Sequence, residues 1–209
     1  MENIKLILNE YIDYNDKSFR NTVFLSFACL VLWIILPILE SRFKLLTKLI
    51  NNDKAKAADF LAYLLIHAGS FRNYAYFQTV YYSKQYDLEE FNIICEASAI
   101  FIGLLSFYIF ACASTKLGLR GMYFGDCFGF VLNNGEPITS FPFNLLSHPQ
   151  YYCFIGGSLS FALFFRSPVG MFITVINVAI LAVVSFFESI ELSKIYGNTK
   201  NGSNKNKSK

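Results

Sequence analysis

Long apolar runs dominate the pattern of hydrophobic and polar positions along this chain. A membrane helix needs roughly 20 predominantly apolar residues. Runs that approach or exceed this length occur at residues 22–39, 59–76, 91–115 and 151–187, and polar side chains interrupt the second of them. The pattern therefore predicts an all-α, polytopic integral membrane protein with about four to five membrane helices.

A break inside the last apolar run decides the number of crossings. Arg166-Ser167-Pro168 lies in the middle of this run. In a single crossing, Arg166 would sit near the bilayer centre, where a charge is costly. Because Ser-Pro favours a turn, we predict a C-terminal hairpin of two helices, which gives five crossings. The hairpin returns the chain, so His148 before it and Glu188 after it face the same side of the membrane.

The distribution of Lys and Arg predicts how these helices are oriented. Cytosolic loops of membrane proteins carry an excess of these residues. With the C-terminus in the cytosol, 12 of the 18 lie on the cytosolic side: Arg42, Lys44, Lys48, Lys54, Lys56, Lys116, Arg120, Lys194, Lys200, Lys205, Lys207 and Lys209. The other 6 lie on the far side: Lys5, Lys17, Arg20, Arg72, Lys84 and Arg166. We therefore predict a cytosolic C-terminus.

Composition supports this class of protein and excludes several others. Hydrophobic residues make up 54% of the 209 residues and charged residues only 16%, whereas a soluble domain usually has about 25% charged residues. The net charge of +3 comes without a basic stripe, which argues against nucleic acid as a partner. The five cysteines are isolated from one another, so neither disulfides nor a metal site is expected. The N-terminus lacks the order of a cleaved signal peptide.

Residues able to carry chemistry gather in the loop 116–150 and near the end of the last helix. The loop combines four glycines, which permit positive φ or close approach, with Asp126, Asn144 and His148. Glu188 and Glu191 are three residues apart and share a helix face. Interfacial turns, an aromatic belt and solvated acids are the simpler interpretations of each feature alone. Glu96 and His67 are further ionisable residues in or near apolar helices.

These residues give the chain a resemblance to the phosphatidylethanolamine and phospholipid N-methyltransferases, which are related to the isoprenylcysteine carboxyl methyltransferases. The likeness covers nearly the whole chain in order and is densest from Leu117 to Tyr196. It is carried by Leu117-Gly118, Gly121, Gly125-Asp126, Phe128-Gly129, Phe141-Pro142-Phe143-Asn144, Pro149, Tyr151, Ser167-Pro168, Gly170, Glu188 and Ile195-Tyr196, with a looser match at Trp33 and Glu40. It implies one methyltransferase membrane domain over residues 1–197, followed by a tail (198–209) that we expect to be disordered.

The chain departs from the family pattern at four places, one of which is Pro137 where the family usually has an arginine before the FPFN segment. The GxG element of the family falls at Gly103-Leu104-Leu105-Ser106, where the second glycine is missing. The paired glutamates become Glu188-Ser189, with Glu191 one turn further on. His148 precedes Pro149, as in the carboxyl methyltransferases.

The resemblance implies S-adenosylmethionine as the methyl donor and phosphatidylethanolamine, or its mono- and dimethyl forms, as the acceptor in the lipid bilayer. The positions that match its donor-binding elements are Gly103, Leu104, Ser106, Asn144, His148, Tyr151, Glu188 and Ser189. Because an ammonium must lose a proton before it can act as a nucleophile, Glu191 and His148 are the candidate proton acceptors. Carboxylates and aromatic faces would suit the cationic groups of both substrates.

Three other interpretations remain open from the sequence. His148-Pro149 suggests carboxyl methylation of a prenylated cysteine, and the missing motif residues suggest a degenerate, non-catalytic member of the family. A small transporter subunit would need a stripe of polar residues within the membrane. The C-terminal Lys205-Asn206-Lys207-Ser208-Lys209 resembles a dilysine signal, so we expect a multi-pass protein of the endoplasmic reticulum membrane.

Overall fold

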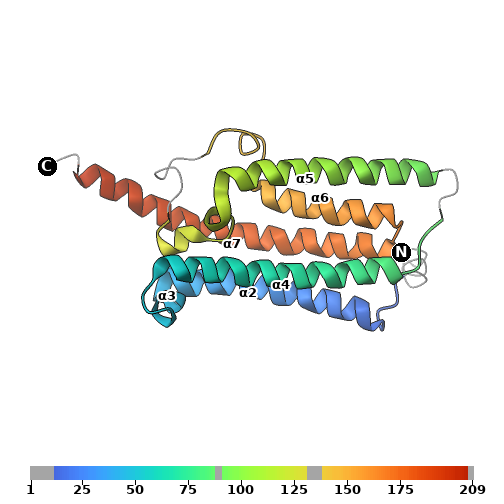
Figure 1. The fold of residues 1–209 in the computed structure, drawn as a ribbon, viewed down its shortest axis with the longest axis horizontal. Helices are drawn as coiled ribbons and strands as arrows, with labels where there is room; N and C mark the ends of the chain where they lie inside the picture. The colour runs from blue at the N-terminus through green and yellow to red at the C-terminus, as the bar shows by residue number, and fades with distance from the viewer. Residues whose placement is uncertain (1–11, 88–90, 131–137, 207–209) are drawn as a thin grey trace.

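The structure is a computed structural model that describes residues 12–87, 91–130 and 138–206, and every regular element within these ranges is a helix. Its long helices are α2 (Lys17–Phe43), α4 (Lys54–Tyr82), α5 (Asn92–Met122), α6 (Pro149–Phe164) and α7 (Pro168–Asn206). Short elements are α3 (Leu45–Leu49) and the 3₁₀ helix η2 (Gly125–Phe128). The expected all-α architecture is confirmed (Figure 1).

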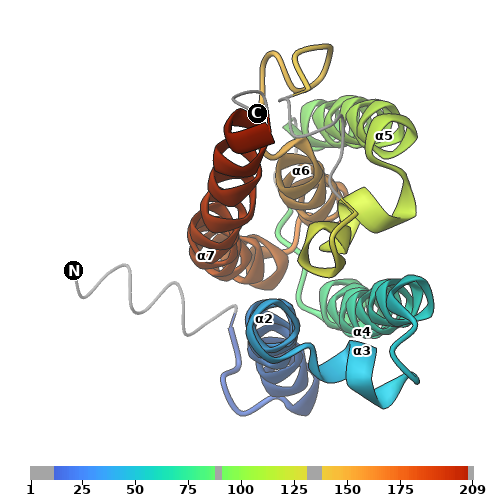
Figure 2. The ribbon, with the colours of Figure 1, turned by 90° about the vertical axis from the view of Figure 1, so that its left-hand side faces the viewer.

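The long helices lie side by side along one axis and alternate in direction (Figure 1). Three segments are long and apolar enough to cross a membrane: Lys17–Phe43, Asn92–Phe128 and Pro168–Lys194. Seen along the bundle (Figure 2), α6 lies between α5 and α7, while α2 packs against α4 and α7. Such a bundle is consistent with a polytopic membrane protein.

The bundle has two ends, which we name for the features found there. The α3 end comprises the C-terminus of α2, α3, the C-terminus of α5, η2 and the N-terminus of α6 (Figure 1). The hairpin end contains the α6–α7 turn and the N-terminus of α5 (Figure 1).

Polar side chains define where the helices at the α3 end begin. Asp53 accepts hydrogen bonds from the backbone N–H groups of Ala55 and Lys56, so it caps α4. The Lys56 backbone N–H, followed by the Lys56 side chain, lowers the pKa of Asp53. Glu40 is buried and accepts hydrogen bonds from the first N–H groups of α3, at Leu46 (2.8 Å) and Thr47 (3.2 Å). Glu40 therefore connects the end of α2 to α3.

The predicted C-terminal hairpin is present. Arg166 adopts a positive φ of 48° between α6 and α7, and Ser167 Oγ accepts a hydrogen bond from the Gly170 N–H at 3.0 Å. Pro168 follows at the first helical position, where its missing N–H costs nothing. Arg166 also pairs with Glu96 of α5 at 2.8 Å. The arginine that argued against a single crossing thus lies in a turn beside a carboxylate.

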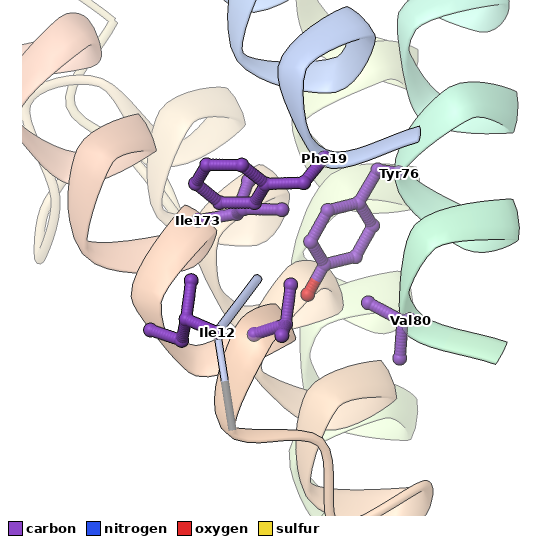
Figure 3. Packing of buried hydrophobic residues seen from close by; sticks show 6 residues of the cluster. Ile12, Phe19, Tyr76, Val80 and Ile173 are labelled. Carbon is purple, nitrogen blue, oxygen red and sulfur yellow. The ribbon is translucent and has the colours of Figure 1, made fainter. Parts of the chain in front are cut away.

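Near the hairpin end, a buried cluster joins three helices and the residues before α2 (Figure 3). Ile12, Phe19, Val80 and Ile173 surround the ring of Tyr76. The Tyr76 hydroxyl donates a hydrogen bond to the Ser158 carbonyl at 2.7 Å. Because a buried phenol needs a partner, this bond fixes α4 against α6.

Two features differ from the sequence predictions. Helix α7 continues to Asn206 and so includes most of the tail that we expected to be disordered, while residues 207–209 lie outside the described residues. Arg72, which we assigned to the far side of the membrane, is buried within α4 and does not belong to a loop. The polar residues around it do not end the helix: Asn73 accepts a hydrogen bond from Arg72, and the exposed His67 bonds the Tyr63 carbonyl of the same helix.

Candidate active site

Aromatic rings from α2, α6 and the connection between α5 and η2 meet at the α3 end of the bundle. The Trp33 ring of α2 lies 6.2 Å from the rings of Tyr123 and Phe124, and 6.3 Å from that of Tyr151 on α6. The contacts with Tyr123 and Phe124 are edge-to-face, an arrangement that stabilises aromatic pairs. These rings form an apolar wall that presents π-faces to a ligand.

A carboxylate lies next to this wall. Tyr151 donates a hydrogen bond from its hydroxyl to Glu188 Oε2 at 2.7 Å. His148 Nδ1 is 3.5 Å from the same oxygen, and its ring stacks on that of Tyr151 with centroids 5.6 Å apart. The Glu188 side chain is only 14% exposed. The expectation that the hairpin brings His148 and Glu188 to the same end is therefore confirmed.

The loop after α5 reaches this region because of its glycines. Gly118 has a φ of 61° and interrupts the helical dihedrals of α5, so the chain bends towards η2 (Figure 1). At Gly125 a Cβ would lie 2.7 Å from the Arg120 carbonyl oxygen, a distance that side chains do not tolerate. Arg120 in turn holds Asp59 of α4 through two hydrogen bonds, of 2.7 and 2.9 Å.

Two cavities flank the aromatic wall. The larger has a volume of about 430 Å³ and is lined by all five long helices, within the size range of ligand pockets. The smaller, of about 20 Å³, is lined by Cys127, Glu188 and Glu191 among others. Trp33 lines both of them.

Several residues that line the larger cavity have buried polar side-chain atoms with no hydrogen-bond partner among the described residues. These atoms are Trp33 Nε1, Gln150 Oε1, and both Oδ1 and Nδ2 of Asn177. Most buried polar atoms in proteins are paired. These unpaired atoms therefore mark the cavity as a site able to bind a ligand that has polar groups.

The structure brings together five of the residues that the sequence singled out. Gly103, Ser106 and Tyr151 line the larger cavity, and Tyr151 joins it to His148 and Glu188. Gly103 and Ser106 also let α5 approach α6, because a Cβ on Gly103 would meet Ser160 Oγ and one on Gly156 would meet Ser106 Oγ.

The other predicted residues lie elsewhere. Leu104 is 66% exposed on the outer surface of α5. Asn144 is exposed in the loop before α6, and Ser189 faces outwards and bonds the Ser185 carbonyl. None of these three lines either cavity.

Glu191 has a different set of contacts from Glu188. Lys194 Nζ is 2.6 Å from Glu191 Oε1, and Arg42 of α2 lies 3.9 Å from the same oxygen. Ser41 Oγ donates to Oε2 at 3.2 Å. Glu191 is thus bound to cations at the junction of α2 and α7, one turn from the His148 cluster.

Sequence comparison places this geometry in a known family. The profile of the family described as phospholipid methyltransferase matches residues 94–199, which contain His148, Tyr151 and Glu188. The chain belongs to the phospholipid methyltransferase family. The predicted resemblance is thereby confirmed.

Relatives within the phospholipid methyltransferase family cover most of the chain. Phosphatidylethanolamine N-methyltransferase A of Dictyostelium discoideum is 29% identical over 97% of this chain and 93% of its own length. Phosphatidyl-N-methylethanolamine N-methyltransferases of Schizosaccharomyces pombe and Neurospora crassa are 33% and 26% identical, over 79% and 90% of this chain and 83% and 87% of their own. No solved structure matches the chain.

Among the residues of the larger cavity that sequence reasoning missed are Arg72, Gln150 and Asn177. A signal existed for two of them, because Arg72 and Asn177 are polar residues inside apolar runs. Gln150 sits beside the His148-Pro149 motif and has no signal of its own.

Proposed function

We propose that this protein methylates the amine of phosphatidylethanolamine, or of its mono- and dimethyl derivatives, with S-adenosylmethionine as the donor. The observation that carries the proposal is the buried Glu188 carboxylate beside an aromatic wall, in a bundle with three helices able to span a membrane. Membership of the family supports methyl transfer to a phospholipid. The names of the three relatives support an ethanolamine lipid as the acceptor.

The site residues fit the proposed donor. When bound, S-adenosylmethionine supplies a methyl group on a sulfonium sulfur, and the group passes to the amine nitrogen as the S–C bond breaks. Glu188 would hold positive charge beside the reacting atoms, and the rings of Trp33 and Tyr151 would offer cation–π faces. The unpaired Trp33 Nε1 would donate a hydrogen bond to the ligand, and Gln150 Oε1 would accept one from it.

His148 is the proposed proton acceptor. Its Nδ1 lies 3.5 Å from Glu188 Oε2, and a carboxylate partner holds an imidazole in one orientation. His148 can therefore take the proton that the lipid ammonium must lose before it attacks. We assign this role to His148 in preference to Glu191, because Glu191 is already bound to Lys194 and Arg42.

The two substrates would reach the site from different phases. A water-soluble donor would enter from the α3 end, and the lipid would enter sideways from the bilayer. We propose that the α3 end and the C-terminus are cytosolic, which agrees with the concentration of Lys and Arg predicted for that side. We further propose the endoplasmic reticulum membrane as the location, because Lys205-Asn206-Lys207-Ser208-Lys209 resembles a dilysine signal.

Methyl transfer from labelled S-adenosylmethionine tests this function. Membranes containing the protein are supplied separately with phosphatidylethanolamine, its mono- and dimethyl forms, and a farnesylcysteine acceptor. We expect label in phosphatidylcholine or its methylated precursors. Label only in a base-labile farnesylcysteine ester would replace the proposal with carboxyl methylation, and no label in correctly inserted protein would contradict methyltransferase activity.

Glu188→Gln should lower kcat/KM about 10- to 100-fold, because an interaction with a charged group contributes about 1.5–3 kcal/mol. Ser193→Ala is the matched control, since Ser193 is exposed on the same helix and bonds only the Ile190 carbonyl among the described residues. Equal activity of the glutamine variant and wild type would remove Glu188 from the site.

A further inference from the structure

Arg72 is a charged side chain buried between the helices. It is 6% exposed, and its Nε donates to Ser26 Oγ at 3.2 Å. Its Nη1 donates to Asn73 Oδ1 at 2.9 Å, and the guanidinium lies 4.3 Å from the centre of the Phe154 ring. Within the described residues, no carboxylate forms an ion pair with it. Buried charges are normally paired, so this arginine has the capacity to bind an anion.

A purely structural role would leave the surroundings of Arg72 fully paired, and they are not. Asn177 of α7 is completely buried and lines the same cavity, yet both of its amide atoms lack partners. Gln150 Oε1 and Trp33 Nε1 line this cavity unpaired as well. A ligand that carries both charge and hydrogen-bonding atoms would satisfy these groups together.

Building on the proposed function, we propose that Arg72 and Asn177 bind the phosphodiester of the acceptor phospholipid. Arginine suits phosphate because its planar fork donates two parallel hydrogen bonds. The amide Nδ2 of Asn177 supplies a further donor. Among the described residues that line the cavity, Arg72 is the only lysine or arginine.

The spacing along α6 fits a lipid head group. Phe154, on which Arg72 packs, lies one turn from Tyr151, which binds Glu188. Three residues of helix rise about 4.5 Å. In a phosphoethanolamine head group only two carbons and one oxygen separate the nitrogen from the phosphorus. A phosphate at Arg72 would therefore leave the amine near Glu188 and His148.

The cavity lining also favours a lipid. Gly69 and Ser70 of α4 and Gly103 and Phe107 of α5 line the cavity between two long helices of the bundle, which flank the same side of the molecule (Figure 2). Small residues on facing helices leave room for a chain to enter from the bilayer. A carboxylate of the water-soluble donor is the competing anion, and the experiment separates the two.

Trp33 is the one tryptophan of the chain and lines the cavity, so its fluorescence can report ligand binding. Short-chain phosphatidylethanolamine, the diacylglycerol of the same chain length and S-adenosylhomocysteine are titrated against purified protein. Arg72→Gln should raise the Kd for phosphatidylethanolamine about 10- to 100-fold and leave the other two unchanged. Arg20→Gln, an exposed arginine at the start of α2, should bind all three like wild type.

An unchanged Kd for phosphatidylethanolamine in Arg72→Gln would overturn the proposal. A loss confined to S-adenosylhomocysteine would overturn it too, because Arg72 would then hold the donor. If Arg72→Gln fails to fold, the Asn177→Leu variant tests the site instead. It should weaken phosphatidylethanolamine binding because it removes the amide donor, and it should raise the Tm because it removes unpaired buried atoms. Wild-type binding by Asn177→Leu would refute the site.

The methyl-transfer assay keeps this inference separate from the proposed function. Wild-type protein that binds phosphatidylethanolamine through Arg72 but transfers no methyl group would leave the phosphate site intact and refute only the function. If wild-type protein methylates phosphatidylethanolamine and the Arg72→Gln variant has an equal kcat/KM, the proposed function would stand and the phosphate site would be refuted.

Discussion

At the scale of single residues, the contacts of the candidate site converge on Glu188. One of its oxygens receives the Tyr151 hydroxyl and faces His148 Nδ1, while the Tyr151 ring lies against Trp33. A buried carboxylate is stable only if such partners compensate its charge. Tyr151 therefore orients Glu188 and forms part of the cavity wall at the same time.

Tyr151→Phe tests this dual role because it removes only the hydroxyl. Hydrogen bonds between membrane helices contribute from about 0.6 to 1.7 kcal/mol, so we expect kcat/KM for methyl transfer to fall about 3- to 15-fold. Tyr152→Phe is the control, since Tyr152 is 52% exposed on the outer side of α6. Equal losses in both variants would show that the hydroxyl of Tyr151 has no specific role.

The sequence predicted that His148 and Glu188 lie on the same side but not their contact or the detail around it. Their common side follows from the turn at Ser167-Pro168, which is a local signal. The role of Tyr151 as a hydrogen-bond donor depends on how α6 is rotated about its axis. That rotation has no sequence signal here, because the residues that face lipid and those that face protein are both apolar.

At the scale of elements, the α6–α7 hairpin holds the site together. Its turn is fixed by Ser167, which also bonds Ser83 at 2.6 Å, and its helices pack closely where Gly170 meets Ala162 and Val80. The hairpin thereby connects to α4 at the end opposite the site. Misalignment there would move Glu188 relative to His148.

Gly170→Ala should destabilise the bundle by about 1–3 kcal/mol, the usual cost of overpacking. A Cβ at Gly170 would lie 2.8 Å from Val80 Cγ2 and 3.0 Å from Ala162 Cβ, so neighbouring helices must shift. Thermal unfolding in detergent measures the change. Gly157→Ala provides the comparison, because a Cβ there meets nothing within 4 Å and should keep or raise the Tm.

The positions of the helices along the chain could be predicted more fully than which side of each helix contacts its neighbours. Apolar length located α2, α5 and the hairpin, while Arg72 and its neighbours made α4 look interrupted. In the structure Arg72 faces other helices: its guanidinium contacts the Ser26 hydroxyl of α2 and the Phe154 ring of α6, as well as the Asn73 amide of its own helix. Leu104 was placed in the site from its motif alone, but the motif does not show which face of α5 it lies on, and in the structure Leu104 is exposed.

At the scale of the whole molecule, the two ends of the bundle have different characters. The α3 end carries the site and several exposed lysines, whereas the hairpin end pairs Arg166 with Glu96. A bundle that takes one substrate from water and another from lipid needs its site near one membrane surface. The side that this surface faces decides which pool of donor the enzyme can use.

Thiol labelling of sealed endoplasmic reticulum vesicles tests this orientation. Lys48→Cys places a thiol on α3, and Lys17→Cys places one at the start of α2, at the opposite end. A membrane-impermeant maleimide added outside should label Lys48→Cys in intact vesicles, and Lys17→Cys only after detergent opens them. The unsubstituted chain, whose five cysteines lie within helices α2, α5, α6 and η2, gives the background. The reverse pattern would place Glu188 and His148 on the lumenal side, away from cytosolic S-adenosylmethionine, and would contradict the proposed route of the donor.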